Sequence, residues 1–149
     1  MAMITPEILL ICTGSLKDRH IAALMDGYLD RLRHEARITV REVRDSTRLR
    51  EGAGIVDLLE KEGGYSFALA EEGSMMSSRR LARRMETITG KLIFIIGGPE
   101  GLDPVVKKKA GELLSLSPMT FTHEMARVLL AEQLYRACTI MHNRRYHRD

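Results

Sequence analysis

A glycine-rich turn follows the most apolar run of the sequence. Residues 91–96 read as a buried strand, and they lead directly into Gly97-Gly98-Pro99-Glu100-Gly101. In open α/β sheets, ligands bind beyond the carboxyl ends of the strands, where glycines let the backbone approach them closely. The spacing matches neither the dinucleotide-binding pattern nor a phosphate-binding loop. The turn therefore indicates a nucleotide-like ligand, and a purely structural tight turn is the alternative.

A second candidate segment spans residues 114–123, where a strand is again followed by a helix. Its short apolar and hydroxyl side chains could give backbone hydrogen bonds and a flat apolar wall to an adenine ring. His123 could cap the last helix or contact a substrate, but a lone histidine is more often structural. We expect this segment to lie close to the glycine turn.

The last helix, from about Glu124 to Met141, is apolar around more than half of its circumference. Its polar stripe is narrow and contains Glu132, Arg136 and Thr139, of which the first two form an (i, i+4) pair. Such a helix should pack both on its own sheet and on another subunit. Arg127 projects among the apolar positions, so its charge must be paired or must face a ligand.

The sequence ends in Asn143-Arg144-Arg145-Tyr146-His147-Arg148-Asp149. A basic terminal segment is usually solvated. An aromatic ring flanked by arginine and histidine, however, suits stacking on an unpaired base together with phosphate contacts. The sequence is compatible with a solvated segment and with a base-binding one.

Composition narrows the class of protein. The 149 residues are 44% hydrophobic, enough for one globular domain over residues 1–149 without disulfide or metal staples. The two cysteines have no partner spacing, the histidines show no zinc spacing, and the early apolar run is too short to span a bilayer. We therefore expect a cytoplasmic protein that binds neither metal nor membrane.

Arginines cluster, with seven between Arg31 and Arg50, which favours a nucleic-acid partner.

Alternating strands and helices must position these segments. Apolar runs predict strands over residues 6–13, 38–43, 65–70 and 91–96, and a short one within 114–121. Helical spacing predicts helices around residues 21–32, 49–59 and 77–90, another that begins at Asp103-Pro104, and the last helix. This order predicts an α/β domain with a mostly parallel sheet of five to six strands and helices on both faces.

Taken together, these segments resemble the RlmH family of large-subunit ribosomal RNA pseudouridine methyltransferases, within the SPOUT superfamily. The resemblance covers the whole chain and is most specific from Ile93 onward. The residues that carry it are Phe94–Leu102, Leu116-Ser117, Met119-Thr120-Phe121, His123, Arg127-Val128-Leu129, Glu132–Ala137 and Tyr146-His147-Arg148. The sequence departs from the family pattern at Ser74, Thr122 and Arg145, where the family commonly has lysine, proline and proline.

The resemblance implies a C-terminal trefoil knot and a homodimer with composite sites. It implies S-adenosyl-L-methionine as the methyl donor and N3 of a pseudouridine in large-subunit (23S) ribosomal RNA, on the ribosome, as the acceptor. The expected cofactor-binding residues are Leu69, Gly97, Gly98, Gly101, Ser117, Pro118, Met119, Thr120, Phe121 and Thr122. The expected catalytic residues are His147 or Tyr146 near the acceptor base, with Arg148 and Arg127 holding phosphate or the imide oxygens. The alternatives are a non-catalytic RNA- or ribosome-binding module of the same fold, and a transfer RNA methyltransferase.

Overall fold

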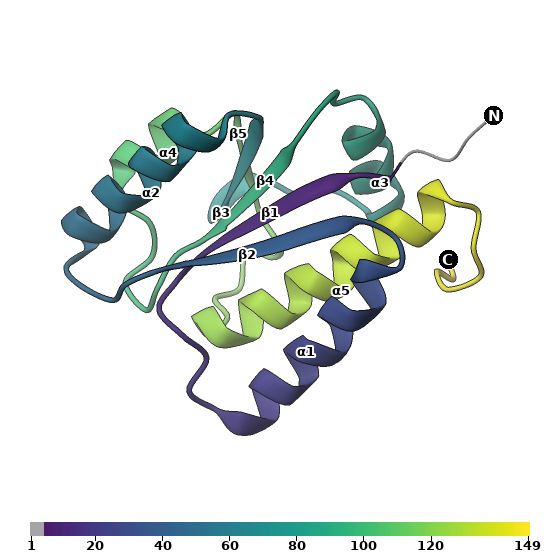
Figure 1. The fold of residues 1–149 in the computed structure, drawn as a ribbon, viewed down its shortest axis with the longest axis horizontal. Coiled ribbons are helices and arrows are strands. Elements are labelled where there is room, and N and C mark those ends of the chain that lie inside the picture. Colours follow the sequence, from purple (N-terminus) through teal and green to yellow (C-terminus); the bar gives the residue numbers. More distant parts are fainter. Residues whose placement is uncertain (1–4) are drawn as a thin grey trace.

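The computed structural model describes residues 5–149, which form a five-stranded sheet with five helices (Figure 1). The strand order is β2-β1-β4-β3-β5, and every neighbouring pair is parallel. The strands are β1 (Glu7–Thr13), β2 (Arg37–Val43), β3 (Tyr65–Ser74), β4 (Leu92–Ile96) and β5 (Glu112–Leu114). The helices are α1 (Arg19–Arg33), α2 (Arg48–Glu62), α3 (Ser78–Glu86), α4 (Pro104–Lys109) and α5 (His123–Met141).

Helices cover both faces of the sheet, as predicted. Ile8, Leu10 and Cys12 of β1 face a core cluster shared with α1, α3 and α5, whereas Leu9 and Ile11 face a cluster shared with α2 and α4. Successive side chains of a strand point to opposite faces, so a continuously apolar strand can serve two cores at once. Helix α5 packs between α1 and α3 on the first face.

Short polar side chains set the helix starts. Asp18, Thr47, Ser77, Asp103 and Thr122 each precede a helix with an extended backbone and accept a hydrogen bond from a backbone N–H of its first turn. Ser77 has this role for α3. Thr122, one of the departures from the family pattern, is the cap of α5, so His123 is not the cap.

A bulge in β3 shapes the edge of the sheet. Both Leu69 and Ser74 pair with Leu114 of β5, so the residues between them leave the regular ladder. A Cβ on Gly73 would lie 2.7 Å from the backbone carbonyl carbon of Leu113, which makes glycine necessary for this close approach. Bulges of this kind redirect side chains, here those of Glu71 and Glu72.

The short fifth strand was predicted but placed too late: β5 spans Glu112–Leu114, so it overlaps the predicted residues 114–121 only at Leu114, and the residues that follow form a loop. Pro118 lacks the N–H that a strand ladder requires. Within the loop, the Ser115 hydroxyl donates to the Ser117 carbonyl, and the Ser117 hydroxyl accepts from the Met119 N–H.

The prediction that Thr139 lies on the polar stripe of the last helix was also wrong. Thr139 is buried, and its hydroxyl donates to the Arg136 carbonyl. The C-terminal knot stays a prediction.

Candidate functional site

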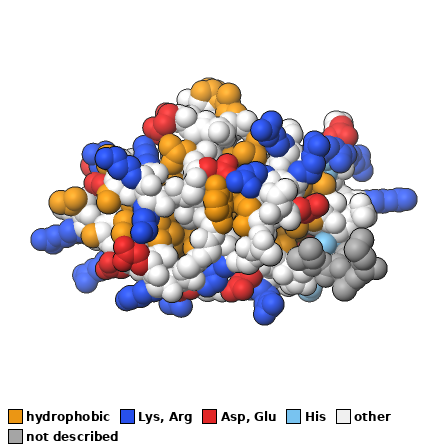
Figure 2. Space-filling model, turned by 90° about the horizontal axis from the view of Figure 1, so that it is seen from above, with side chains coloured by type: hydrophobic (Ala, Val, Ile, Leu, Met, Phe, Trp, Pro, Cys, Tyr) orange, Lys and Arg blue, Asp and Glu red, His pale blue; other side chains and the backbone are white. Residues whose placement is uncertain are grey.

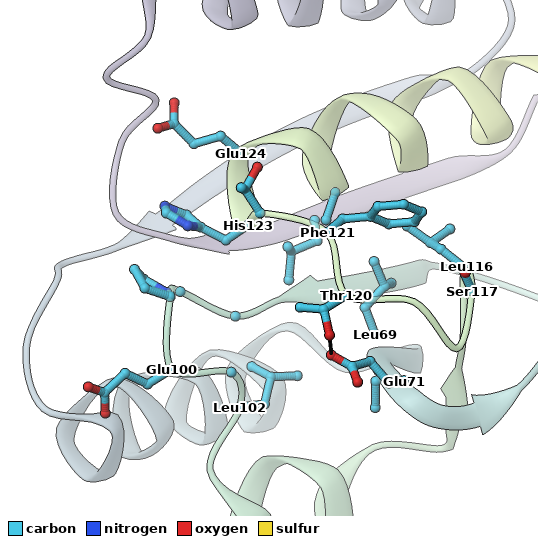
Figure 3. Close-up of a pocket in the computed structure, with 18 of the residues that line it drawn as sticks. Leu69, Glu71, Glu100, Leu102, Leu116, Ser117, Thr120, Phe121, His123 and Glu124 are labelled. Atoms are coloured by element: carbon cyan, nitrogen blue, oxygen red, sulfur yellow. Dashed lines mark hydrogen bonds between the residues drawn. The ribbon is translucent and has the colours of Figure 1, made fainter.

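A pocket of about 960 Å³ lies at the carboxyl ends of β3 and β4 (Figure 3). Three chain segments supply most of its wall: the β3 bulge, the turn after β4, and the loop between β5 and α5. These segments are far apart in the sequence, and the parallel order β4-β3-β5 brings their ends together. The pocket therefore occupies the place where parallel α/β sheets bind ligands.

The glycine turn forms one wall through its backbone. The Gly101 N–H donates to the Gly98 carbonyl at 3.0 Å, and Gly101 has a positive φ of 78° that suits glycine. A Cβ on Gly97 would lie 2.8 Å from the carbonyl carbon of Gly101. The turn is thus packed backbone against backbone, and it presents main-chain groups to the pocket in place of side chains.

The loop between β5 and α5 forms the opposite wall and is joined to the β3 bulge. The Thr120 hydroxyl donates to Glu71 Oε1 at 2.7 Å, as Figure 3 shows. Met119 and Phe121 on the same loop are among the exposed large hydrophobic side chains, at 73% and 41% exposure. The loop thus combines a fixed polar anchor with apolar surface suitable for a flat ring.

All the expected cofactor-binding residues except Pro118 line this pocket. Sequence reasoning missed the carboxylates around its rim: Asp18, Glu71, Glu72, Glu100 and Glu124. The bulge that brings two of them to the pocket leaves no pattern in the sequence. Lys107 also lines the pocket and pairs with Glu72 at 3.2 Å, and the charge of the remaining carboxylates favours a ligand that carries a cationic group.

Arg127 does not line the pocket, because its guanidinium is buried behind the adjoining loop. Its Nη2 donates to the carbonyls of Thr13 (2.7 Å) and Gly14, and its Nη1 pairs with Glu42 at 3.0 Å. One turn away, Glu124 accepts from the N–H groups of Lys17 and Asp18. The first turn of α5 thus holds the β1–α1 loop, and Arg127 has a structural role in this geometry.

The C-terminal segment folds back on α5, away from the pocket. The Tyr146 ring packs edge-on against Tyr135, and its hydroxyl donates to Glu132 Oε1 at 3.1 Å. Burial and the Glu132 carboxylate raise the pKa of Tyr146, so it remains a protonated donor at neutral pH. Arg136 pairs with Glu132 as predicted and also contacts His147. Arg148 is exposed.

The length of α5 separates this segment from the pocket. Glu132 lies nine positions after the first residue of α5, which corresponds to about 14 Å along the helix axis. In the described part of the chain, Arg127, Tyr146, His147 and Arg148 are all missing from the pocket wall. A single copy therefore does not bring the two groups of candidate residues together.

Neither cysteine is a candidate nucleophile. Cys12 and Cys138 are buried in the core, and burial raises their pKa values to about 11 and about 12. Both remain thiols at neutral pH and act as small apolar side chains in the core.

Charge of both signs is dispersed over the face of the molecule drawn in Figure 2. Figure 2 shows Lys and Arg side chains around much of the outline of one face, with Asp and Glu between them.

Within residues 5–149 we find no set of three or more His, Cys, Asp and Glu side chains arranged to hold a metal ion. No helix in that range is long and apolar enough to cross a bilayer.

Comparisons with known proteins give a consistent result. A family described as "Predicted SPOUT methyltransferase" matches residues 7–147. The ribosomal RNA large subunit methyltransferase H of Synechococcus sp. is 39% identical, with both chains covered completely. The protein of that name from Natranaerobius thermophilus is 35% identical over 92% of this chain and 96% of its own. A probable methylase family protein from Haemophilus influenzae has a similar fold, with a TM-score of 0.62 and 14% identity over 97% of this chain and 71% of its own.

Proposed function

Because this chain belongs to the SPOUT methyltransferase family, we propose that it transfers a methyl group from S-adenosyl-L-methionine to N3 of a pseudouridine in large-subunit ribosomal RNA. The observation that carries the proposal is the pocket at the carboxyl ends of β3 and β4, whose wall combines the glycine turn with the β5–α5 loop. The reaction takes place on the ribosome, in the cytoplasm.

The pocket fits this methyl donor in size and in charge. Its volume is within the range of small-molecule sites. The glycine turn has no side chains at Gly97, Gly98 and Gly101, so a ligand in the pocket can approach its backbone. Leu69, the glycine turn and Ser117–Thr122 would hold the donor, and the acidic rim suits its positive charge. When bound, the donor supplies an electrophilic methyl group on a sulfonium, so the remaining task of the chain is to position the acceptor.

The acceptor side requires a second copy of the chain. A single copy keeps residues 146–148 about 14 Å along α5 from the end that borders the pocket. A twofold dimer in which two α5 helices run antiparallel would bring the C-terminal segment of one copy toward the pocket of the other. Met125, partly exposed on the first turn of α5, and the exposed Phe121 offer apolar surface beside the pocket for such a contact.

Within this composite site, the C-terminal residues have distinct roles. Arg148 contacts phosphate or an imide oxygen of the acceptor base. Tyr146, with its raised pKa, donates a hydrogen bond and does not act as the base. His147 is the titratable group near the acceptor N3, which must lose its proton. Arg127 positions the β1–α1 loop and does not contact the substrate.

The proposed activity has a direct test. Ribosomal RNA from a strain that lacks this gene should lose one methyl group at a pseudouridine, and mass spectrometry should show its return when the gene is restored. A non-catalytic binding module would leave the RNA unchanged and need not bind S-adenosyl-L-methionine in a calorimetric titration. Methylation of transfer RNA in place of ribosomal RNA would favour the other alternative.

The composite site predicts a specific complementation. Two impaired variants, Gly97→Ala in the pocket and His147→Ala in the C-terminal segment, should regain activity when co-expressed and assayed at a donor concentration too low for Gly97→Ala. Each mixed dimer then has one site with an intact pocket and an intact segment, so about a quarter of wild-type activity is expected from random pairing. If pocket and segment of the same copy act together, every mixed dimer stays inactive, and the dimer proposal is overturned.

A further inference from the structure

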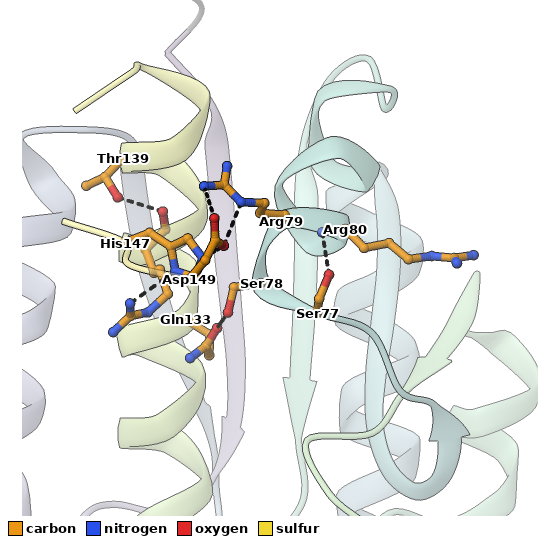
Figure 4. Close-up of polar contacts among 9 residues, drawn as sticks. Ser77, Ser78, Arg79, Arg80, Gln133, Thr139, His147 and Asp149 are labelled. Carbon is orange, nitrogen blue, oxygen red and sulfur yellow. Dashed lines mark hydrogen bonds and ion pairs between the residues drawn. The ribbon is translucent and has the colours of Figure 1, made fainter. Parts of the chain in front are cut away.

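Asp149 directly follows the Tyr146-His147-Arg148 motif and contacts both α3 and His147 (Figure 4). Its Oδ1 and Oδ2 each lie 2.9 Å from a nitrogen of Arg79, in a two-pronged ion pair. The same Oδ1 lies 3.1 Å from His147 Nε2. One carboxylate thus connects the C-terminal segment to the first turn of α3.

The hydrogen bonds around His147 determine which ring nitrogen carries the proton. Arg136 Nη1 lies 3.2 Å from His147 Nδ1, and a guanidinium can only donate. Nδ1 must therefore accept, so the proton of the neutral ring is on Nε2. Nε2–H in turn donates to Asp149, which as a carboxylate can only accept. The imidazole is held in one tautomer, with its lone pair directed toward Arg136.

The two anchors of this arrangement are themselves fixed. The Ser78 hydroxyl donates to Gln133 Oε1 at 2.6 Å, which joins the first turn of α3 to α5 beside Arg79. Glu132 holds the Arg136 guanidinium. The His147 side chain is only 14% exposed, whereas that of Asp149 is 72% exposed. The imidazole of His147 is thus mostly covered, and the exposed carboxylate of Asp149 orients it from the surface.

The carboxylate remains ionised under working conditions. The Arg79 hydrogen bonds and then the His147 hydrogen bond lower the pKa of Asp149 to about 2. Asp149 can therefore accept from Nε2–H at neutral pH.

We propose that Asp149, anchored by Arg79, is a positioning residue that holds His147 in the Nε2–H tautomer, so that the lone pair lies on Nδ1, which accepts from Arg136 in this structure and takes the N3 proton when the acceptor base replaces that contact. The proposal rests on the methyl transfer proposed above for its catalytic consequence. The tautomer itself does not depend on that function. The arrangement is that of a carboxylate–histidine pair, in which the carboxylate orients the ring and stabilises its charged form.

The test compares four variants of the full-length protein. Asp149→Ala and Arg79→Ala should lower kcat for methyl transfer about tenfold or more, within the usual contribution of a positioned base. The Kd for S-adenosyl-L-methionine should stay within about twofold of the wild-type value, because the pocket is unchanged. Asp149→Asn keeps an accepting oxygen but loses the charge, so its kcat should lie between those of the alanine variant and the wild type. Arg80→Ala is the matched control, since the neighbouring Arg80 side chain points away from Asp149 in Figure 4 and its kcat should not change.

A second measurement reads the tautomer without any substrate. Nitrogen-15 NMR of the histidine rings, with the His147 signals assigned by comparison with His147→Gln, should show the Nε2–H form in the wild type and in Arg80→Ala. In Asp149→Ala the ring is no longer held with Nδ1 against Arg136, so it can turn, and signals of the Nδ1–H form should appear beside those of the Nε2–H form. An Asp149→Ala protein with wild-type kcat, or with an unchanged His147 tautomer, overturns the proposal. A wild-type protein that transfers no methyl group overturns the proposed function, and the NMR result alone then decides the role of Asp149.

Discussion

Replacing Gly97 by alanine should lower the affinity for S-adenosyl-L-methionine by about tenfold to a hundredfold. The added Cβ would lie 2.8 Å from the carbonyl carbon of Gly101, 3.0 Å from its oxygen and 3.0 Å from the Leu102 nitrogen. All three are backbone atoms, so the clash is relieved only if the turn opens. Overpacking of this kind costs about 1–3 kcal/mol. Because the turn is part of the pocket wall, its displacement should reduce the binding free energy of the donor by a similar amount. Isothermal titration calorimetry measures the change.

Gly27→Ala provides the matched control for this prediction. Gly27 lies in α1, and a Cβ there would meet no atom within 4 Å. The same substitution should leave cofactor affinity unchanged and stabilise the helix by about 1 kcal/mol. A Gly97→Ala protein that folds and binds the donor with wild-type affinity would show that the glycine turn is not part of the cofactor site. At the adjacent Gly98, a Cβ would point toward Thr13, 3.2 Å from its Cγ2.

Replacing Arg127 by methionine should destabilise the fold by about 3 kcal/mol. The change leaves the buried carbonyls of Thr13 and Gly14 without their donor, and each lost partner costs about 1–3 kcal/mol. Glu42 contributes less because its side chain is 46% exposed and regains water. Methionine also removes the buried Arg127 Nε, which has no hydrogen-bond partner in the described structure, and this limits the net loss.

Thermal unfolding measures this effect, and we expect the Tm to fall by roughly 10 °C for a chain of this size. Arg33→Met is the control: Arg33 pairs with Asp30 on the surface, with both side chains more than half exposed, and its loss should change stability by less than about 1 kcal/mol. If Arg127→Met keeps the wild-type Tm but loses RNA binding, Arg127 serves the substrate and not the loop.

The sequence predicted most of the architecture because most of its signals are local. Continuous apolar runs marked β1 and β4, and caps such as Asp103 followed by Pro104 marked helix starts. The (i, i+4) pair of Glu132 and Arg136 follows from helix geometry alone. The family resemblance added the cofactor segments, which composition and periodicity left open.

The remaining features depend on contacts between distant segments. The paired register of Leu69 and Ser74 on Leu114 creates the bulge that brings Glu71 to the pocket, and no spacing within residues 65–74 reveals it. Arg127 appeared equally suited to a ligand or to an ion pair, and its contact with the Thr13 carbonyl, which favours the structural role, has no signature in the sequence. The distance between the pocket and His147 likewise follows from the return of the C-terminal segment along α5.

The strand order also determines when the sheet can assemble during synthesis. Strand β1 pairs with β2 on one edge and with β4 on the other. The second edge, which includes Ile8, can pair only after Leu92 and the rest of β4 have been synthesised. Strand β3 likewise has no partner until β4 is available on one side and β5 on the other. Pairings between such distant segments form slowly, because a long loop must close before any contact compensates for its lost entropy. A nascent chain shorter than about residue 96 would therefore expose an open edge of β1, a site for aggregation or for chaperone binding until β4 leaves the ribosome.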